Sequence, residues 1–210
     1  LADTAIAQPC IVALQISLLA LYKHWGVSPS AVVGHSTGEV SACYAAGVFS
    51  LEDTMHLAVV RGRIMRKATG LGKMASVSLP EKDLLPFLDN APGVEKTGVE
   101  VAATNSPSAT VVSGTKEALT KLLASLHEKG IQAKELKVDY AFHSEQVAPF
   151  MKELEKELSA FSLSPKTPST RIISTLTGKE ENDTSVSFTP AYWAKQMRGS
   201  VSFLQATKTL

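Results

Sequence analysis

The sequence has few of the features that mark disulfide-rich, metal-binding or nucleic-acid-binding proteins. Cysteine occurs only twice in 210 residues, at Cys10 and Cys43, and both lie in apolar runs. We therefore expect two buried free thiols in a reducing compartment, with neither a disulfide nor a metal site. Because 21 Lys and Arg are balanced by 20 Asp and Glu, the net charge predicts no nucleic-acid partner and no anionic membrane surface.

Long apolar runs are also scarce. The longest, Cys10–Tyr22, contains Gln15 and Ser17. We expect it to be too short and too polar to span a bilayer, and no charged leader precedes it. The sequence begins without Met in one helical pattern and ends in another, which suggests a piece of a longer protein. These features together predict a cytoplasmic protein without a membrane partner, and 44% hydrophobic residues suffice for one substantial core.

The first seventy residues alternate between helical and strand patterns, as expected of an α/β core. Ser50, with Asp53 three residues later, forms a capping box and predicts a helix start. The β-branched run 31–33 predicts a short buried strand. In chain order, the patterns predict a helix over 8–25, a strand over 31–33, and helices over 38–46 and 51–68.

The middle of the chain follows a different order of elements. The predicted order is strand 74–79, helix 81–89, strands 99–104 and 109–113, helix 116–129 and strand 132–138. This β-α-β-β-α-β order is typical of a ferredoxin-like unit. We therefore predict a small subdomain over 72–138, inserted between 1–71 and 139–210. Beyond it we expect a charged helix over 146–161, a strand over 172–176 and a helix over 190–198.

A Gly-x-Ser-x-Gly pattern centred on Ser36 lies between the strand over 31–33 and the helix that follows. In that context the pattern is typical of a nucleophile elbow, a sharp turn that lifts the serine hydroxyl clear of the sheet. Small residues at Gly34 and Gly38 avoid collisions within the turn. The helix directs N–H groups, including that of Thr37, at a developing oxyanion. The alternative is a glycine-rich turn with an incidental serine.

A serine hydroxyl needs a base before it can attack an ester, and five histidines are available. His143 follows a predicted strand at a loop, where catalytic groups are often presented. His35 precedes the nucleophile, would point away from it, and is expected to line the pocket. The remaining histidines are expected on helices, among solvated or polar residues: His24, His56 and His127. His143 is therefore the favoured base.

Four separate motifs resemble the malonyl-CoA:acyl-carrier-protein transacylase family. They are Gly34–Glu39, Tyr44–Gly47, Arg61-Gly62 and Tyr140–His143. Within the family, the chain is most similar to acyltransferase domains of type I polyketide synthases, in particular iterative fungal-type ones. The resemblance runs nearly end to end and implies an α/β-hydrolase-like large subdomain with a ferredoxin-like small subdomain inserted. The family's early Gly-Gln-Gly turn, which supplies a second oxyanion N–H, and its late Gly-Pro-His/Gly turn are absent from the sequence.

The resemblance also implies roles for individual residues. It makes Ser36 the nucleophile and His143 the general base, which the backbone carbonyl of Gln196 would orient. Two further residues would line the acyl pocket, Gln8 from the first helix and Asn105 from the small subdomain. The family needs no cofactor or metal in this domain.

Arg61, which lies 25 residues after the nucleophile, corresponds to the family's carboxylate clamp. A malonyl carboxylate needs a planar, bidentate donor that stays charged. On a helical projection Arg61 borders an apolar face, so it could instead be an arginine that covers apolar surface with its stem. Arg63 and Arg66 compete for the clamp if the helix register differs. By resemblance, Phe142 crowds an α-methyl group and favours malonyl over methylmalonyl, whereas Tyr140 fits both patterns.

The resemblance implies a two-step transfer of malonyl from malonyl-CoA, through an ester on Ser36, to the phosphopantetheine arm of an acyl carrier protein. Neighbouring synthase domains of a polyketide or fatty acid pathway would be the partners. One alternative is a serine hydrolase or thioesterase of α/β-hydrolase type, which needs an Asp or Glu between Ser and His. Asp139 is too close to His143 for that role. The other alternative is a non-catalytic docking domain.

Overall fold

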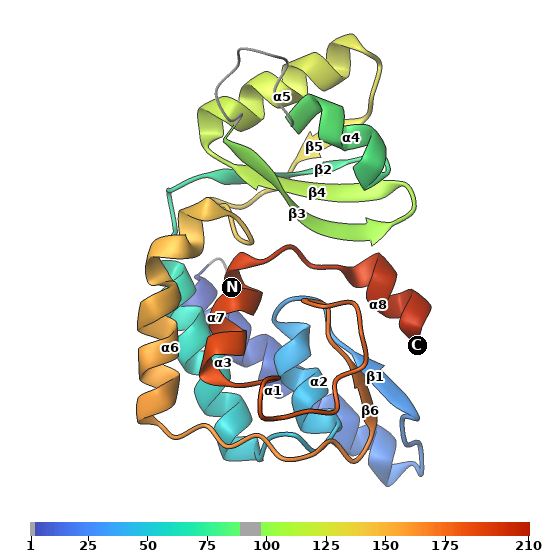
Figure 1. Cartoon of the computed structure of the whole chain (residues 1–210), viewed down its shortest axis with the longest axis vertical. Coiled ribbons are helices and arrows are strands. Elements are labelled where there is room, and N and C mark those ends of the chain that lie inside the picture. Colours follow the sequence, from blue (N-terminus) through green and yellow to red (C-terminus); the bar gives the residue numbers. More distant parts are fainter. Residues whose placement is uncertain (1–2, 89–97) are drawn as a thin grey trace.

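The two ends of the chain share one hydrophobic core, and the middle forms a second. A computed structural model describes residues 3–88 and 98–210. The larger core joins residues from both ends, such as Val12, Leu57 and Trp193, and includes Met74 and Ala102 from the middle segment. Every member of the second core falls between residues 75 and 133. The two parts lie one above the other in Figure 1, with the middle segment on top.

The larger part contains a parallel pair of strands surrounded by helices. In this pair β1 (Ala31–Val33) lies beside β6 (Arg171–Ile173), with Val32 opposite Ile172. The helices are α1 (Thr4–His24), α2 (Gly38–Ala45), α3 (Leu51–Arg66), α6 (Met151–Ala160), α7 (Pro190–Arg198) and α8 (Phe203–Thr209). The predicted capping box is confirmed, because Ser50 and Asp53 bond to each other's backbone N–H at the start of α3.

The smaller part has the predicted β-α-β-β-α-β order. Its elements are β2 (Lys73–Val77), α4 (Glu81–Leu88), β3 (Val99–Ser106), β4 (Ala109–Gly114), α5 (Lys116–Glu128) and β5 (Ala133–Glu135). The four strands form an antiparallel sheet in the order β3-β4-β2-β5. Both helices cover the face of the sheet that points away from the larger part (Figure 1). In this strand order β3 is an edge strand, and it lies beside the larger part.

Several predicted element bounds differ from the structure. The charged helix over 146–161 is divided into a 3-10 turn, η1 (Glu145–Phe150), followed by α6. Pro149 lies in that turn and has no N–H to donate to an α-helical hydrogen bond. The strands predicted over 132–138 and 172–176 are shorter, as β5 and β6. The predicted last residue of α4, Asp89, lies outside the described residues.

The helix predicted over 8–25 is longer in the structure, and the expectation that its apolar run is too short and too polar to span a bilayer was wrong. Helix α1 begins at Thr4, where the Asp3 side chain accepts from the Ala5 N–H, and runs for 21 residues. Its most apolar 18-residue window has a mean hydropathy of 1.8 and is 17% buried. Among the described residues this helix alone is long and apolar enough to cross a membrane, a test that core helices of soluble proteins also pass. Cys10 is exposed on it, whereas Cys43 is buried as expected.

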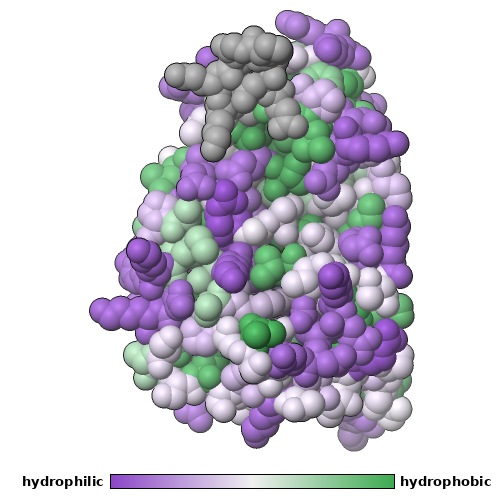
Figure 2. Space-filling view, in the orientation of Figure 1, coloured by the Kyte–Doolittle hydropathy of each residue, from purple (hydrophilic) through white to green (hydrophobic). Residues whose placement is uncertain are grey.

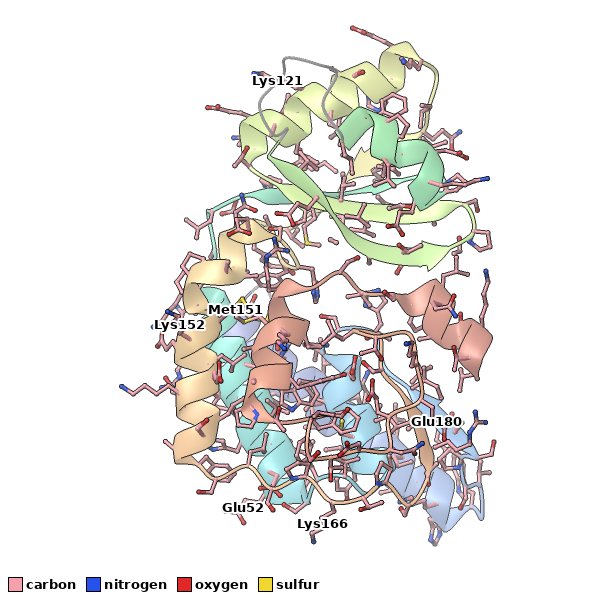
Figure 3. All side chains as sticks on the ribbon, viewed as in Figure 1. Glu52, Lys121, Met151, Lys152, Lys166 and Glu180 are labelled. Atoms are coloured by element: carbon pink, nitrogen blue, oxygen red, sulfur yellow. The ribbon has the colours of Figure 1, made fainter. Side chains whose placement is uncertain are left out.

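Polar side chains dominate the face shown in Figure 2, and hydrophobic ones appear in separate groups. On α6, polar side chains face the solvent, and Figure 3 shows Lys152 pointing outward. Met151, one residue earlier, packs against the larger core. The helix thus has one solvated face, as its charged sequence predicted.

Candidate active site

The turn between β1 and α2 has the geometry of a nucleophile elbow. Ser36 has a φ of 51°, in the left-handed region that few residues other than glycine adopt. A Cβ at Gly34 would lie 2.2 Å from the carbonyl carbon of Gly38, so no side chain fits there. The small residue at position 34 is therefore a steric requirement of the turn. The prediction for Gly38 was wrong, because a Cβ there would meet nothing closer than the Gln15 Nε2, at 3.9 Å.

Ser36 and His143 lie together although 107 residues separate them in the chain. The Ser36 Oγ is 2.8 Å from the His143 Nε2, and the His143 Nδ1 is 2.8 Å from the Gly199 carbonyl oxygen. A carbonyl can only accept, so Nδ1 carries the proton and Nε2 is free to accept one from the serine. His143 itself is buried, with a φ of 58°. This pair can move a proton from Ser36 to the imidazole.

The surroundings keep His143 neutral. Burial is the largest cause that lowers its pKa from 6.5 to about 3. The positive charge of Arg61 contributes to the same shift, whereas the Gly199 and Gln196 backbones favour the charged form. A neutral imidazole is the form that accepts a proton, so the resting site is ready to act as a base near pH 7.

Arg61 is 0% exposed and lies beside the serine. Its Nη atoms donate to four neutral acceptors: Gln8 Oε1 (2.5 Å), Thr37 Oγ1 (2.7 Å), Gln196 Oε1 (3.1 Å) and Ser36 Oγ (3.3 Å). Its Nε has no hydrogen-bond partner among the described residues. Burial lowers the pKa of Arg61 to about 10, and the negative charge of Glu39 opposes that shift. A buried cation held by neutral groups is suited to an anionic ligand.

The other two arginines of α3 are exposed and already paired. Arg63 bonds to Glu157, and Arg66 lies 3.4 Å from Asp3. The alternative clamps considered from the sequence therefore lie away from Ser36, and the guanidinium of Arg61 is too deeply buried to cover surface.

Two backbone groups favour the charged form of His143, and the one predicted from the sequence makes the smaller contribution. The His143 Nδ1 donates to the Gly199 carbonyl at 2.8 Å, and the Gln196 backbone makes the smaller contribution to the imidazole's pKa. Gly199 ends α7, where carbonyls have no partner within the helix, but no sequence motif marked that position. The Gln196 side chain instead donates to the Ser36 carbonyl oxygen at 3.0 Å and accepts from Arg61.

The remaining predicted pocket residues form two pairs. The His35 Nε2 lies 2.8 Å from the Asn105 Oδ1, which links the elbow to β3 of the smaller part. Tyr140 and Phe142 stack with ring centroids 3.7 Å apart, just before His143 in the chain. An open groove of about 460 Å³ adjoins His35 between α1 and α2, but neither Ser36 nor His143 lines it.

The other histidines lie on helices, away from Ser36. His24 and His127 are exposed, as expected. His56 is half-buried, contrary to its expected polar surroundings, because its ring stacks on Phe161 at 3.6 Å between centroids.

Glu39, the last residue of the elbow motif, received no role from the sequence. It is fully buried, and its carboxylate accepts from the Thr175 N–H (3.2 Å), the Thr175 hydroxyl (2.5 Å) and the Tyr192 hydroxyl. Burial raises its pKa, and these hydrogen bonds counteract the shift. A buried carboxylate with so many donors belongs to the support of the elbow.

Comparisons with known proteins show which family the chain belongs to. Residues 1–210 match the acyl transferase domain family. The chain is 37% identical to polyketide synthase GfsE of Streptomyces halstedii, over 98% of this chain and 5% of that protein. It is 36% identical to reducing polyketide synthase PKS2 of Cochliobolus heterostrophus, over 99% of this chain and 10% of that protein. The chain thus spans a small part of the curated relatives it matches.

Solved structures share the fold. The acyltransferase domain from the second module of the salinomycin polyketide synthase has a TM-score of 0.89 and 32% identity, covering 100% of this chain and 47% of that one. The malonyl-CoA:ACP transacylase of Synechocystis sp. PCC 6803 has a TM-score of 0.81 and 29% identity, covering 95% and 64%. With the family match over its whole length, the chain belongs to the acyl transferase domain family.

Proposed function

We propose that this chain transfers a malonyl group from malonyl-CoA, through an ester on Ser36, to the phosphopantetheine thiol of an acyl carrier protein. The observation that carries the proposal is the buried Arg61, which donates only to neutral groups and lies 3.3 Å from the Ser36 hydroxyl. An acyl group that bears a carboxylate would supply the missing negative charge. The relatives named as polyketide synthases and as a malonyl-CoA:ACP transacylase support the same reaction.

In the first step His143 Nε2 takes the proton of Ser36 while the Ser36 Oγ attacks the thioester carbonyl carbon. The imidazolium keeps its Nδ1–H bond to the Gly199 carbonyl. We assign the Thr37 N–H, at the start of α2, to the developing oxyanion. The C–S bond then breaks, and the coenzyme A thiolate leaves with the proton that His143 returns.

In the second step the carrier's thiol gives its proton to His143 and attacks the serine ester. The ester bond breaks, and Ser36 regains a proton from His143. We assign Arg61 to the malonyl carboxylate, with Gln8 and the Gln196 side chain holding the guanidinium in place. The pairs His35–Asn105 and Tyr140–Phe142 would line the acyl pocket, where Phe142 disfavours an α-methyl group.

We further propose the domain arrangement that the family resemblance implies. Residues 1–71 and 139–210 form an α/β-hydrolase-like large subdomain, and residues 72–138 form a ferredoxin-like small subdomain. The carrier protein and neighbouring synthase domains would be the partners of this chain, with no cofactor in this domain. Two unpaired cysteines fit a cytoplasmic setting.

Intact-protein mass spectrometry after incubation with malonyl-, methylmalonyl- and acetyl-CoA tests the proposal. We expect malonyl on Ser36 as the main adduct, none on Ser36→Ala, and transfer of the group when a carrier protein is added. Release of free malonate without transfer would identify a hydrolase instead. A parent protein that never acquires an acyl group would point to a docking domain.

A further inference from the structure

Two separate chain segments hold His143 in place, and one side chain of the smaller part contacts both. The Oε1 of Glu100, on β3, accepts from the backbone N–H of Glu145 at 3.0 Å, two residues after His143. The other oxygen, Oε2, lies 2.8 Å from the Nη2 of Arg198, the residue before Gly199. The same Nη2 also donates to the Glu145 Oε2 at 2.8 Å, so Arg198 contacts both acidic residues. One carboxylate therefore joins the loop that carries the imidazole to the loop that carries its orienting carbonyl.

The chain that leaves Gly199 is also paired with β3. The Val201 N–H donates to the Ala102 carbonyl, and the Thr104 N–H donates to the Val201 carbonyl, both at 2.9 Å. Val201 thus extends the small antiparallel sheet at its edge, in parallel with Ala103. Figure 1 shows this segment running from α7 along the lower side of β3 to α8.

The conformation of His143 needs external support. Its φ of 58° is uncommon for a residue with a side chain and persists only where surrounding structure holds it. Gly199 is held by hydrogen bonds on both sides, because its N–H donates to the Lys195 carbonyl at 2.7 Å and its carbonyl accepts from His143. Loosening either loop would move the Nε2 of His143 relative to the Oγ of Ser36.

We propose that Glu100 and Arg198 are positioning residues, which set the alignment of His143 with Ser36 by tying both of its supporting loops to β3. The inference rests on the proposed function, because it takes Ser36 as the acylated group and His143 as its base. It assigns the smaller part of the molecule a share in aligning the base.

Because this ion pair is partly exposed, its effect on the position of His143 can be measured apart from any effect on stability. The side chains of Glu100 and Arg198 are 39% and 28% exposed, and ion pairs so close to solvent contribute little to stability. A small displacement of a base can nevertheless lower a rate by up to about 100-fold. We therefore expect substitutions here to slow acylation without unfolding the protein.

The chain offers a matched control in Glu153, whose side chain is 38% exposed and pairs with Lys67 between α6 and α3. Glu100→Ala, Arg198→Met, Arg198→Lys and Glu153→Ala would be compared by rapid-quench acylation of Ser36 with malonyl-CoA and by urea unfolding. We expect Glu100→Ala and Arg198→Met to lower the saturated acylation rate about 10-fold, with KM changed less than about 2-fold. Arg198→Lys, which keeps the charge, should recover most of the rate, and Glu153→Ala should match the parent.

The outcomes separate the two proposals. If the parent protein takes no malonyl group on Ser36, the proposed function fails. If the parent is acylated and Glu100→Ala is acylated as fast as Glu153→Ala, only the positioning role is overturned, and a rise in KM at an unchanged rate overturns it too. If Glu100→Ala unfolds at lower urea than Glu153→Ala, Arg198→Met decides: slower acylation at unchanged KM supports the role, and an unchanged rate overturns it.

Discussion

Two opposite charges, Arg61 and Glu39, are buried near the elbow, and they differ in how fully their polar atoms are hydrogen-bonded. Arg61 and Glu39 are both 0% exposed, and neither forms an ion pair within the described part of the chain. Glu39 is surrounded by donors that satisfy both of its oxygens, whereas the Nε of Arg61 has no partner in residues 3–88 and 98–210. The Glu39 carboxylate is therefore enclosed by protein donors, whereas the Arg61 guanidinium remains available to a ligand.

The difference follows from where each residue lies. Glu39 is in the first turn of α2, where the helix dipole favours a negative charge. Its partner Thr175 also approaches the Gly34 carbonyl at 3.1 Å, so the carboxylate ties the chain after β6 to the beginning of the elbow. Arg61 reaches Ser36 from α3. The first arrangement supports the turn, and the second serves whatever binds to the serine.

Removing the available charge should give the largest effect. Arg61→Ala would leave a malonyl carboxylate unpaired in a desolvated site, at a cost of about 2–5 kcal/mol in malonyl transfer. Acylation of Ser36 by malonyl-CoA and by acetyl-CoA would be measured side by side. We expect the malonyl rate to fall steeply and the acetyl rate to change little, with Arg61→Lys between parent and Ala. An unchanged ratio of the two rates would refute the clamp.

Removing the enclosed charge should affect stability instead. Glu39→Ala would strand the Thr175 and Tyr192 donors and take away the negative charge that favours protonated Arg61, so we expect a loss of about 3–5 kcal/mol in the free energy of unfolding. Urea titration measures the loss. The malonyl-to-acetyl ratio of the folded fraction should stay near that of the parent, and a large change in that ratio would mean that Glu39 takes part in substrate selection.

The elbow could be predicted from local residue types, because a strand, Gly34 and a helix start define the turn around Ser36. The roles of His143 and Arg61 were implied by the resemblance to a family, and Arg61 is the one arginine of α3 on the buried side. Two features could not be found in this way. The role of Gly199 depends on where α7 ends in space, and the network of Glu39 depends on Thr175 and Tyr192, which are more than 130 residues away.

The contributions of His143 and Glu39 to the free energy of unfolding depend on pH in opposite directions. His143 has its pKa lowered to about 3, so its contribution to stability is complete above 6.5 and is lost as the pH falls toward 3. Glu39 has its pKa raised above 4.5, so its contribution is present below 4.5 and is lost as the pH rises through its folded value. Between pH 6.5 and 5, His143 alone should lower the free energy of unfolding by about 2 kcal/mol.

Urea unfolding at pH 7 and 5 tests this for the parent, for His143→Ala and for His127→Ala, which alters an exposed histidine. We expect the parent and His127→Ala to lose stability together and His143→Ala to lose less. The acylation rate of the parent should show no inflection near pH 6.5, because His143 stays neutral there. An inflection at 6.5 would mean that the imidazole is hydrated, in conflict with its burial.

Removing single hydroxyl groups that bond to Glu39 or to Arg61 should give the smallest effects and should test the difference between the two charges most closely. Tyr192→Phe removes one donor from Glu39, and Thr37→Val removes one acceptor from Arg61. We expect Tyr192→Phe to cost about 1.5 kcal/mol in unfolding, since hydrogen bonds to charged groups are worth more than neutral ones, and to leave the malonyl-to-acetyl ratio unchanged. Thr37→Val keeps the backbone N–H, and the Thr37 side chain makes no capping bond to α2, but Arg61 loses an acceptor, so we expect a similar cost of about 1.5 kcal/mol in unfolding. Unlike Tyr192→Phe, it should also shift the ratio about 5-fold, because a guanidinium with one fewer fixed contact is less well aligned for a carboxylate. If both variants lost stability alike and neither changed the ratio, Arg61 would be as enclosed as Glu39, and the distinction between the two charges would fail.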